Sequence, residues 1–153
     1  MEKPQFVYTT YIRTTPEKLW DAVIKPEFSG QYWGGNANVS EDWKPGSKWQ
    51  HVSAADTSDV YVDGEILESD PPKRLVLSWV DPDNTADRSK VTFELEPLAD
   101  MVRLTVIHGE FEADTSMITK VSLGWPMVLS SLKSWLETGV PMDISSVKTC
   151  SNA

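Results

Sequence analysis

The sequence is poor in cysteine and in positive charge, and each shortage excludes a class of protein. Its single cysteine, Cys150, excludes an intramolecular disulfide and a zinc site built from several thiolates. The 14 Lys and Arg residues are outnumbered by 23 Asp and Glu residues, which gives a net charge of −9. Because an acidic surface repels phosphate groups and anionic lipid headgroups, we expect neither nucleic acids nor membrane surfaces as partners.

Long hydrophobic runs are also missing. The uncharged stretch 121–132 is interrupted by Ser122, Gly124 and Pro126, and it is shorter than the roughly 20 apolar residues of a membrane span. The start of the sequence has no basic region followed by an apolar stretch, so no signal peptide is expected. The motifs of phosphate loops, dinucleotide sites and nucleophile elbows are absent as well. We therefore expect a cytoplasmic protein without a membrane span and with no obligatory cofactor.

Tryptophan, by contrast, is abundant, with seven residues in a chain of 153. Each carries a large apolar ring and one N–H donor, so such an excess fills a core, lines a pocket or marks an interface. The length fits one domain, which can bury a sizeable core without disulfides or a structural metal.

The N-terminal part of the sequence predicts one strand and one helix. Residues 6–13 are rich in β-branched and aromatic residues and are typical of a strand. Thr15 can cap a helix that begins at Pro16, and the apolar residues of 19–24 recur at helical spacing. Pro26 and Gly30 should end that helix, and a short turn or helical piece over 28–35 carries Trp33.

The middle of the sequence has the two-residue period of strands. We expect strands over 39–43, 47–54, 60–69, 75–80, 90–98 and 101–111. Residues 81–87 are interpreted as a polar loop. Asp63-Gly64 is a strong hairpin signal, but because 55–58 already supplies a turn, we interpret Gly64 as a bulge in a continuous strand.

One long helix follows the strands. Apolar residues recur at alternating spacings of three and four, and the helix of about 20 residues is about 30 Å long, enough to cross a sheet. These residues are Ile118, Val121, Trp125, Val128, Leu132 and Trp135. Gly139 is a plausible C-cap, and Pro126 predicts a kink or a late helix start. We therefore place the domain at 1–139 and interpret 140–153 as a polar, frayed tail.

The order of these elements predicts an α+β domain. About six to seven antiparallel strands form a curved sheet that wraps around the long C-terminal helix. The strand at 90–98 is the clearest example, because Val91, Phe93 and Leu95 alternate with Thr92, Glu94 and Glu96. One face of the sheet should therefore be covered and the other wet.

Four segments, in this order along the chain, resemble a known family. They are Thr15-Pro16-Glu17-Lys18-Leu19-Trp20, then 64–68 with 71–75, then Arg103 to Phe111, and finally Gly124-Trp125 with Leu129, Leu132 and 136–137. The pattern over residues 5–138 resembles the single-domain bacterial relatives of the C-terminal domain of the activator of heat-shock-protein-90 ATPase. These proteins belong to the START-like, birch-pollen-allergen helix-grip superfamily.

The resemblance implies a fold and a cavity rather than a defined activity. Members of the superfamily typically hold an apolar or amphipathic small molecule between sheet and helix, so binding of such a molecule is the leading hypothesis. A second hypothesis is an enzyme of the polyketide cyclase or dehydratase kind that uses His108 as acid or base. A third is a protein-binding module that regulates a chaperone, although the co-chaperones that give the family its name have two domains. A homodimer is an open alternative.

The candidate site is therefore a set of ligand-binding residues, with no catalytic or metal-binding residue assigned. His108 continues the strand phase of the buried residues before it and should point to the covered face. For the tryptophans, packing in the core is at least as good an interpretation. For His108, a half-buried ring bonded to a neighbouring backbone group or carboxylate is the favoured one. The candidate ligand-binding residues are Trp33, Trp49, Trp79, Phe93, His108, Trp125 and Leu129. Trp20 and Trp135 are expected to be core, and no spacing supports a metal site at His51 and His108.

Overall fold

The first strand leads into two short helices. In the computed structural model, which describes residues 4–112 and 116–147, β1 (Phe6–Ile12) precedes α1 (Pro16–Ile24) and α2 (Pro26–Tyr32). Thr15 caps α1 as predicted, because its Oγ1 accepts a hydrogen bond from the backbone N–H of Lys18 at 3.2 Å. Pro26 follows the end of α1, also as predicted, and then opens α2.

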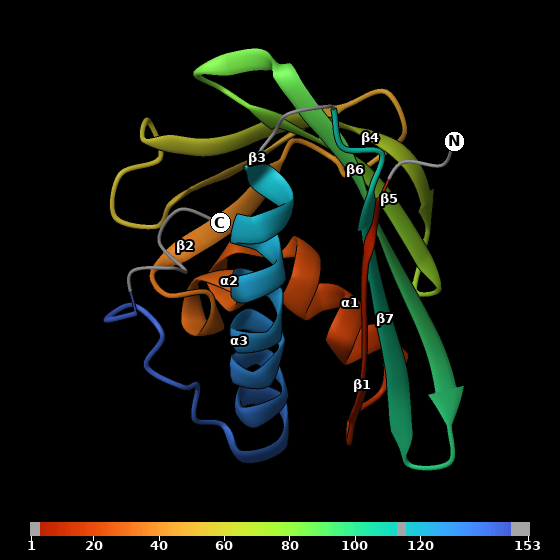
Figure 1. The fold of residues 1–153 in the computed structure, drawn as a ribbon. Coiled ribbons are helices and arrows are strands. Elements are labelled where there is room, and N and C mark those ends of the chain that lie inside the picture. Colours follow the sequence, from red (N-terminus) through yellow and green to blue (C-terminus); the bar gives the residue numbers. More distant parts are fainter. Residues whose placement is uncertain (1–3, 113–115, 148–153) are drawn as a thin grey trace.

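Seven antiparallel strands form one strongly curved sheet (Figure 1). The remaining six are β2 (Asn36–Ser40), β3 (Lys48–Ser53), β4 (Val60–Asp70), β5 (Arg74–Asp81), β6 (Asn84–Leu98) and β7 (Met101–Gly109). Their order across the sheet is β1-β7-β6-β5-β4-β3-β2, so the first strand pairs with the last. The helices α1 and α2 connect the two edges of the sheet.

The long helix α3 (Met117–Thr138) lies in the concave side of the sheet (Figure 1). Gly139 ends it in the left-handed conformation, with a φ of 83° and its N–H bonded to the carbonyl of Trp135. The predicted α+β helix-grip fold is thereby confirmed. The alternative of a late helix start at Pro126 is wrong, since the helix begins at Met117 and continues through the proline.

The structure differs most from the predicted strand boundaries at two places. The strand expected over 39–43 ends at Ser40, whose Oγ bonds to the backbone of Lys48 and Trp43, and Trp43 itself has a φ of 54°. The loop expected over 81–87 is a tight turn, because Asp81 pairs with Asn84 and β6 begins there. The carboxylate of Asp81 accepts the N–H of Asp83 and so holds this turn.

Gly64 lies within a continuous strand, as predicted, but it is not a bulge. The shift in register between β4 and β5 falls between Ile66 and Glu68 instead. A Cβ on Gly64 would lie 2.0 Å from the carbonyl oxygen of Ser78 and 2.4 Å from Nε1 of Trp49. Glycine is required here because the indole of Trp49 crosses directly over the backbone.

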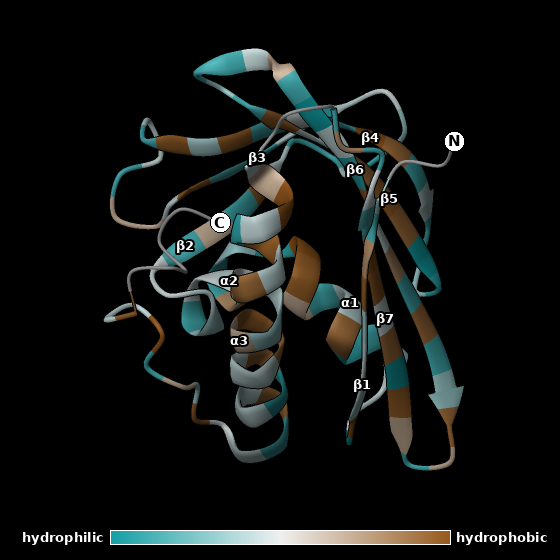
Figure 2. Ribbon diagram, in the orientation of Figure 1, coloured by the Kyte–Doolittle hydropathy of each residue, from teal (hydrophilic) through white to brown (hydrophobic). Residues whose placement is uncertain are grey.

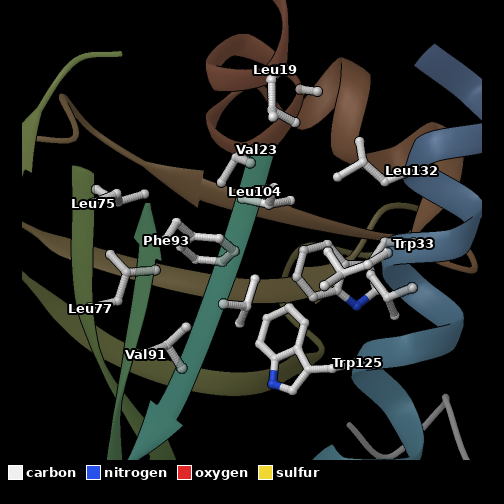
Figure 3. Close-up of a cluster of buried hydrophobic side chains, with 14 of the residues drawn as sticks. Leu19, Val23, Trp33, Leu75, Leu77, Val91, Phe93, Leu104, Trp125 and Leu132 are labelled. Atoms are coloured by element: carbon white, nitrogen blue, oxygen red, sulfur yellow. The ribbon is translucent and has the colours of Figure 1, made fainter. Parts of the chain in front are cut away.

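Hydrophobic and hydrophilic residues alternate along the strands (Figure 2). Many of the hydrophobic ones are buried. The inward residues of the sheet meet the apolar faces of the helices in one core, where Figure 3 shows Leu19 and Val23 of α1 facing Leu104. The predicted wet face is present, since Glu94 and Glu96 pair with Arg74 and Arg103.

The residues after α3 are not frayed as far as they are described. Ile144 is buried in the core, and the backbone N–H of Met142 bonds to Oγ of Ser131 at 3.1 Å. The expectation of a free tail is therefore corrected for 140–147, because this segment folds back on α3; Cys150 lies outside the described residues. Within the described ranges, no helix is both long and apolar enough to cross a membrane.

Candidate functional site

Three tryptophans from separate elements meet between the sheet and α3. Trp33 follows α2, Trp79 belongs to β5 and Trp125 to α3, and all three are buried. The ring centroid of Trp125 lies 5.5 Å from that of Trp33 and 5.6 Å from that of Trp79. Figure 3 shows Trp125 extending from α3 toward the strands, with Trp33 beside it. We call these three residues the tryptophan cluster.

Trp49 extends the aromatic surface along the sheet. Its ring centroid lies 5.5 Å from that of Trp79, and its Nε1–H donates to the carbonyl of Ser78 at 2.8 Å. This bond runs from β3 to β5 across Gly64 of β4. Since its only donor is already used, Trp49 forms part of a wall and has no polar group left for a ligand.

Phe93 and Leu129 are buried in the same core. The Phe93 ring meets Trp125 edge to face, with a centroid distance of 5.8 Å. Neither residue lines the cavity described below, so both support the cluster from behind. Trp135, expected to be core, is only partly buried and packs on Phe28 and Tyr32.

His108 is fully buried, and both of its ring nitrogens are bonded. Its Nδ1 accepts the indole N–H of Trp125 at 3.0 Å, and its Nε2 lies 2.7 Å from Oγ of Ser89. Because an indole nitrogen can only donate, the proton of the neutral imidazole is on Nε2 and is donated to Ser89. Burial lowers the pKa of His108 to about 3, so the ring is neutral at physiological pH.

His51, which the sequence prediction left out of the site, lies on the other side of Trp79. It is also fully buried, and burial lowers its pKa to about 3. Its Nδ1 lies 2.8 Å from Oδ1 of Asn38, while Nδ2 of Asn38 donates to the carbonyl of Val23 at 3.0 Å. His51 Nε2 has no hydrogen-bond partner within residues 4–112 and 116–147. The alternation of Trp49 and His51 along β3 is the sequence signal that could have placed His51 on the covered face.

Only a small cavity remains inside the tryptophan cluster. Its volume is about 10 Å³, enough for roughly one water molecule. Its walls are the three tryptophans together with Val121, Gly124 and Val128. The interior is therefore closed by its own aromatic side chains, and an apolar ligand does not fit there without a rearrangement.

A larger pocket of about 380 Å³ opens at the N-terminal end of α3. It lies between the first turns of this helix and the adjoining ends of β4, β5 and β6, and we call it the mouth pocket. It shares Trp79 and Val121 with the small cavity, so these two side chains separate the two spaces. Its polar lining is mainly acidic and consists of Asp59, Tyr61, Asp81, Asp83, Asp87, Ser116 and Lys120.

The acidic lining of the mouth pocket affects the groups around it. The hydroxyl of Tyr61 donates to the Asp59 carboxylate at 3.0 Å, and this bond raises the pKa of Tyr61. A neighbouring hollow of about 570 Å³, which shares Val80 and Pro82 with the mouth pocket, is larger, but it is lined by charges of both signs and by no aromatic residue. The mouth pocket is the better candidate because it adjoins the tryptophan cluster.

Comparison with known proteins places this geometry in a family. The family model described as activator of Hsp90 ATPase homolog 1-like protein matches residues 13–137. The chain belongs to this family. No curated protein matches it by sequence.

Solved structures of other proteins share the fold. CalU16 from Micromonospora echinospora is 20% identical, with a TM-score of 0.72 over 97% of this chain and 83% of its own. The Aha1 dimer from Colwellia psychrerythraea is 18% identical, with a TM-score of 0.70 over 89% and 98% of the two chains. PFC0360w, an HSP90 activator from Plasmodium falciparum, is 22% identical, with a TM-score of 0.71 over 86% and 95%. These likenesses show the fold of the Hsp90-activator-like family and not the activity.

The structure brings five of the seven predicted site residues into contact. Trp125 meets Trp33, Trp79, Phe93 and His108, while Trp49 touches only Trp79 among them and Leu129 packs in the core behind. Sequence reasoning missed Asn38, His51 and Ser89. Among the residues that the structure describes, no group of three His, Cys, Asp or Glu side chains could hold a metal ion.

Proposed function

We propose that the protein binds a small molecule with an apolar body in the mouth pocket, against the tryptophan cluster. The carrying observation is that this pocket and the interior cavity share Trp79 and Val121. The body of a ligand fits in the outer space, whose volume of about 380 Å³ is within the range of small-molecule sites. A small group at its tip then reaches the inner space when the side chains of the shared wall turn.

The charge of the pocket selects among ligands. Four aspartates face one lysine around the mouth, and the protein as a whole has a net charge of −9. A negative potential lowers the affinity for anions, so a neutral molecule should bind more tightly than a carboxylate with the same body. Free fatty acids are therefore less suitable ligands than neutral amphiphiles.

An enzyme that uses His108 is the less favoured alternative. Both nitrogens of this ring are bonded within the protein, and its pKa of about 3 leaves it a weak base. A general acid or base works best with a pKa near the working pH and within reach of the substrate. Neither condition is met at His108, which supports binding over proton transfer.

Contact with a chaperone is a second candidate function. It is supported by the family match over 13–137 and by the fold shared with the HSP90 activator from Plasmodium falciparum. Its test is the ATP turnover of a bacterial Hsp90 with and without this protein, and a saturable, several-fold stimulation would support it. Self-association, suggested by the dimeric Colwellia psychrerythraea protein, is tested by the mass of the protein in solution.

The binding function is tested by titration with neutral and anionic probes of one size. Propylbenzene, 4-propylanisole and 4-propylphenol should each shift the indole signal of Trp79 and the methyl signal of Met117 saturably in NMR spectra, and 4-propylbenzoate should bind more weakly. Trp43, which lies outside the pocket lining, serves as the reference signal.

A matched pair of variants locates the binding. Val121→Phe fills the mouth and should lower the affinity about tenfold or more, whereas Leu123→Phe on the exposed face of the same helix should not. Shifts that stay linear with every probe would refute the binding function.

A further inference from the structure

Among the side chains that the structure describes, two buried polar atoms lack partners, and they belong to neighbouring rings. The indole N–H of Trp33 and Nε2 of His51 are both buried without a hydrogen bond. The two ring centroids lie 4.7 Å apart. Leaving a buried polar group unsatisfied destabilises the folded state, so two such groups side by side require an explanation.

The hydrogen bonds of Asn38 fix which of the two atoms donates. Its Nδ2 donates to the carbonyl of Val23, so its Oδ1 faces His51 as an acceptor. Nδ1 of His51 must then carry the proton of the neutral ring, which leaves Nε2 as a bare acceptor. Trp33 offers a donor and His51 an acceptor.

Few polar groups can bond to both atoms at once, because the group must accept a hydrogen bond from Trp33 and donate one to His51. A carboxylate or an ether only accepts, and an ammonium group only donates. A hydroxyl group, like the water molecule that it would replace, does both with a single oxygen atom. It is also small enough for the cavity of about 10 Å³ that Trp33 lines together with Trp79 and Trp125. His51 does not line this cavity but packs on two of its walls, Trp33 and Trp79.

We propose that the ligand is a neutral alcohol or phenol whose hydroxyl group donates to His51 and accepts from Trp33. This inference rests on the proposed binding function and specifies the polar end of the ligand. The apolar body occupies the mouth pocket, and the hydroxyl passes the wall formed by Trp79 and Val121.

The test compares three probes with the same body and different polar ends. Only 4-propylphenol can both donate and accept, whereas 4-propylanisole only accepts and propylbenzene does neither. By titration calorimetry, 4-propylphenol should bind the intact protein at least about tenfold more tightly than either. It should also shift the ¹⁵N signals of the Trp33 indole and His51 Nε2.

Two substitutions assign this preference to the pair. Trp33→Phe removes the donor and His51→Phe removes the acceptor, and each should reduce the advantage of 4-propylphenol about tenfold. Trp33→Phe breaks no hydrogen bond, so it remains informative if His51→Phe fails to fold. Trp135→Phe, outside the pocket lining, is the matched control and should leave the preference unchanged.

The outcomes separate this inference from the binding function. Equal, saturable binding of all three probes in the mouth pocket would overturn the hydroxyl assignment and leave the binding function standing. A phenol preference that survives both substitutions would also overturn it, since the hydroxyl would then lie elsewhere. Saturable binding by none of the probes would refute both.

Discussion

His51 and His108 are both buried beside Trp79, but they differ in how many of their ring nitrogens are hydrogen-bonded. Both are fully buried on the concave face, and their ring centroids lie 6.4 and 5.1 Å from that of Trp79. Burial lowers the pKa of each to about 3. His108 has a partner on each nitrogen, whereas His51 has one on Nδ1 only.

The difference shows that burial alone does not reveal the role of a polar residue. A buried histidine with every bond made, such as His108, ties a helix to a strand and stabilises one arrangement of the core. A buried histidine with a bare nitrogen retains binding capacity. The number of unmade bonds therefore distinguishes a residue that holds the structure together from one that can hold a ligand.

The largest effect is expected at Trp125, on the His108 side. Trp125→Ala removes a buried ring and leaves Nδ1 of His108 without its donor, so the free energy of unfolding should fall by about 3–5 kcal/mol. Urea unfolding measures this loss. Trp135→Ala, at a partly buried position, should cost clearly less. Equal losses would show that the bond to His108 contributes little.

Acid should affect both histidines alike. Their pKa is about 3 in the folded protein against 6.5 in the unfolded chain, so only the unfolded state takes up protons as the pH first falls. Stability is complete above about pH 6.5 and decreases toward pH 3, by up to about 1.4 kcal/mol per pH unit for each histidine. Urea unfolding between pH 6.5 and 4.5 measures the slope, which His51→Phe should roughly halve. An unchanged slope in this variant would contradict the assignment to His51.

Trp49, like His108, has its hydrogen bond made within the protein, and we expect it to have a structural role. A substitution at Gly64, over which its indole lies, tests this expectation. Gly64→Ala forces a Cβ against the Ser78 carbonyl and the Trp49 indole and should cost about 1–3 kcal/mol. Thermal unfolding provides the measurement. Gly30→Ala in α2, where a Cβ meets only Ala54 at 3.7 Å, is the control and should be neutral or slightly stabilising.

The smallest effect is a difference between two similar substitutions. Trp125→Phe removes a bonded donor and Trp33→Phe an unbonded one, so the first should cost about 1 kcal/mol more than the second. Parallel urea titrations of the two variants measure this difference. A larger loss at Trp33 would mean that its N–H already has a partner in the folded protein.

Much of the fold could be predicted because its determinants are local. Thr15 and Gly139 mark helix ends through their own backbone and side-chain chemistry, and strand alternation places Phe93 and His108 on the covered face. Trp43 was predicted to lie in a strand, but β2 ends at Ser40. The hydroxyl group of Ser40 accepts the backbone N–H of Trp43 there, and the strand pattern gives no sign of this bond.

The details of the site could be predicted less well, because they depend on contacts between distant segments. Asn38 orients His51 through a carbonyl of α1, and Ser89 meets His108 because β6 begins earlier than its polar composition indicates. Trp33, Trp79 and Trp125 meet between the sheet and α3, but their role as ligand-binding residues stays a prediction. No pattern in the sequence reveals which indole N–H is left unpaired.

Pro126 has a mechanical consequence for the grip of the helix on the sheet. A proline has no N–H to donate to the carbonyl four residues earlier, which here is that of Ser122. The helix α3 therefore lacks one backbone hydrogen bond next to Trp125. The segment before this gap carries Met117 and Val121, both in the lining of the mouth pocket. The segment after it carries Val128 and Leu132 in the core. Met117 and Val121 are themselves buried in the core, so the missing hydrogen bond weakens the helix at this point without freeing its first turns. Amide exchange should therefore be faster before the proline than after it.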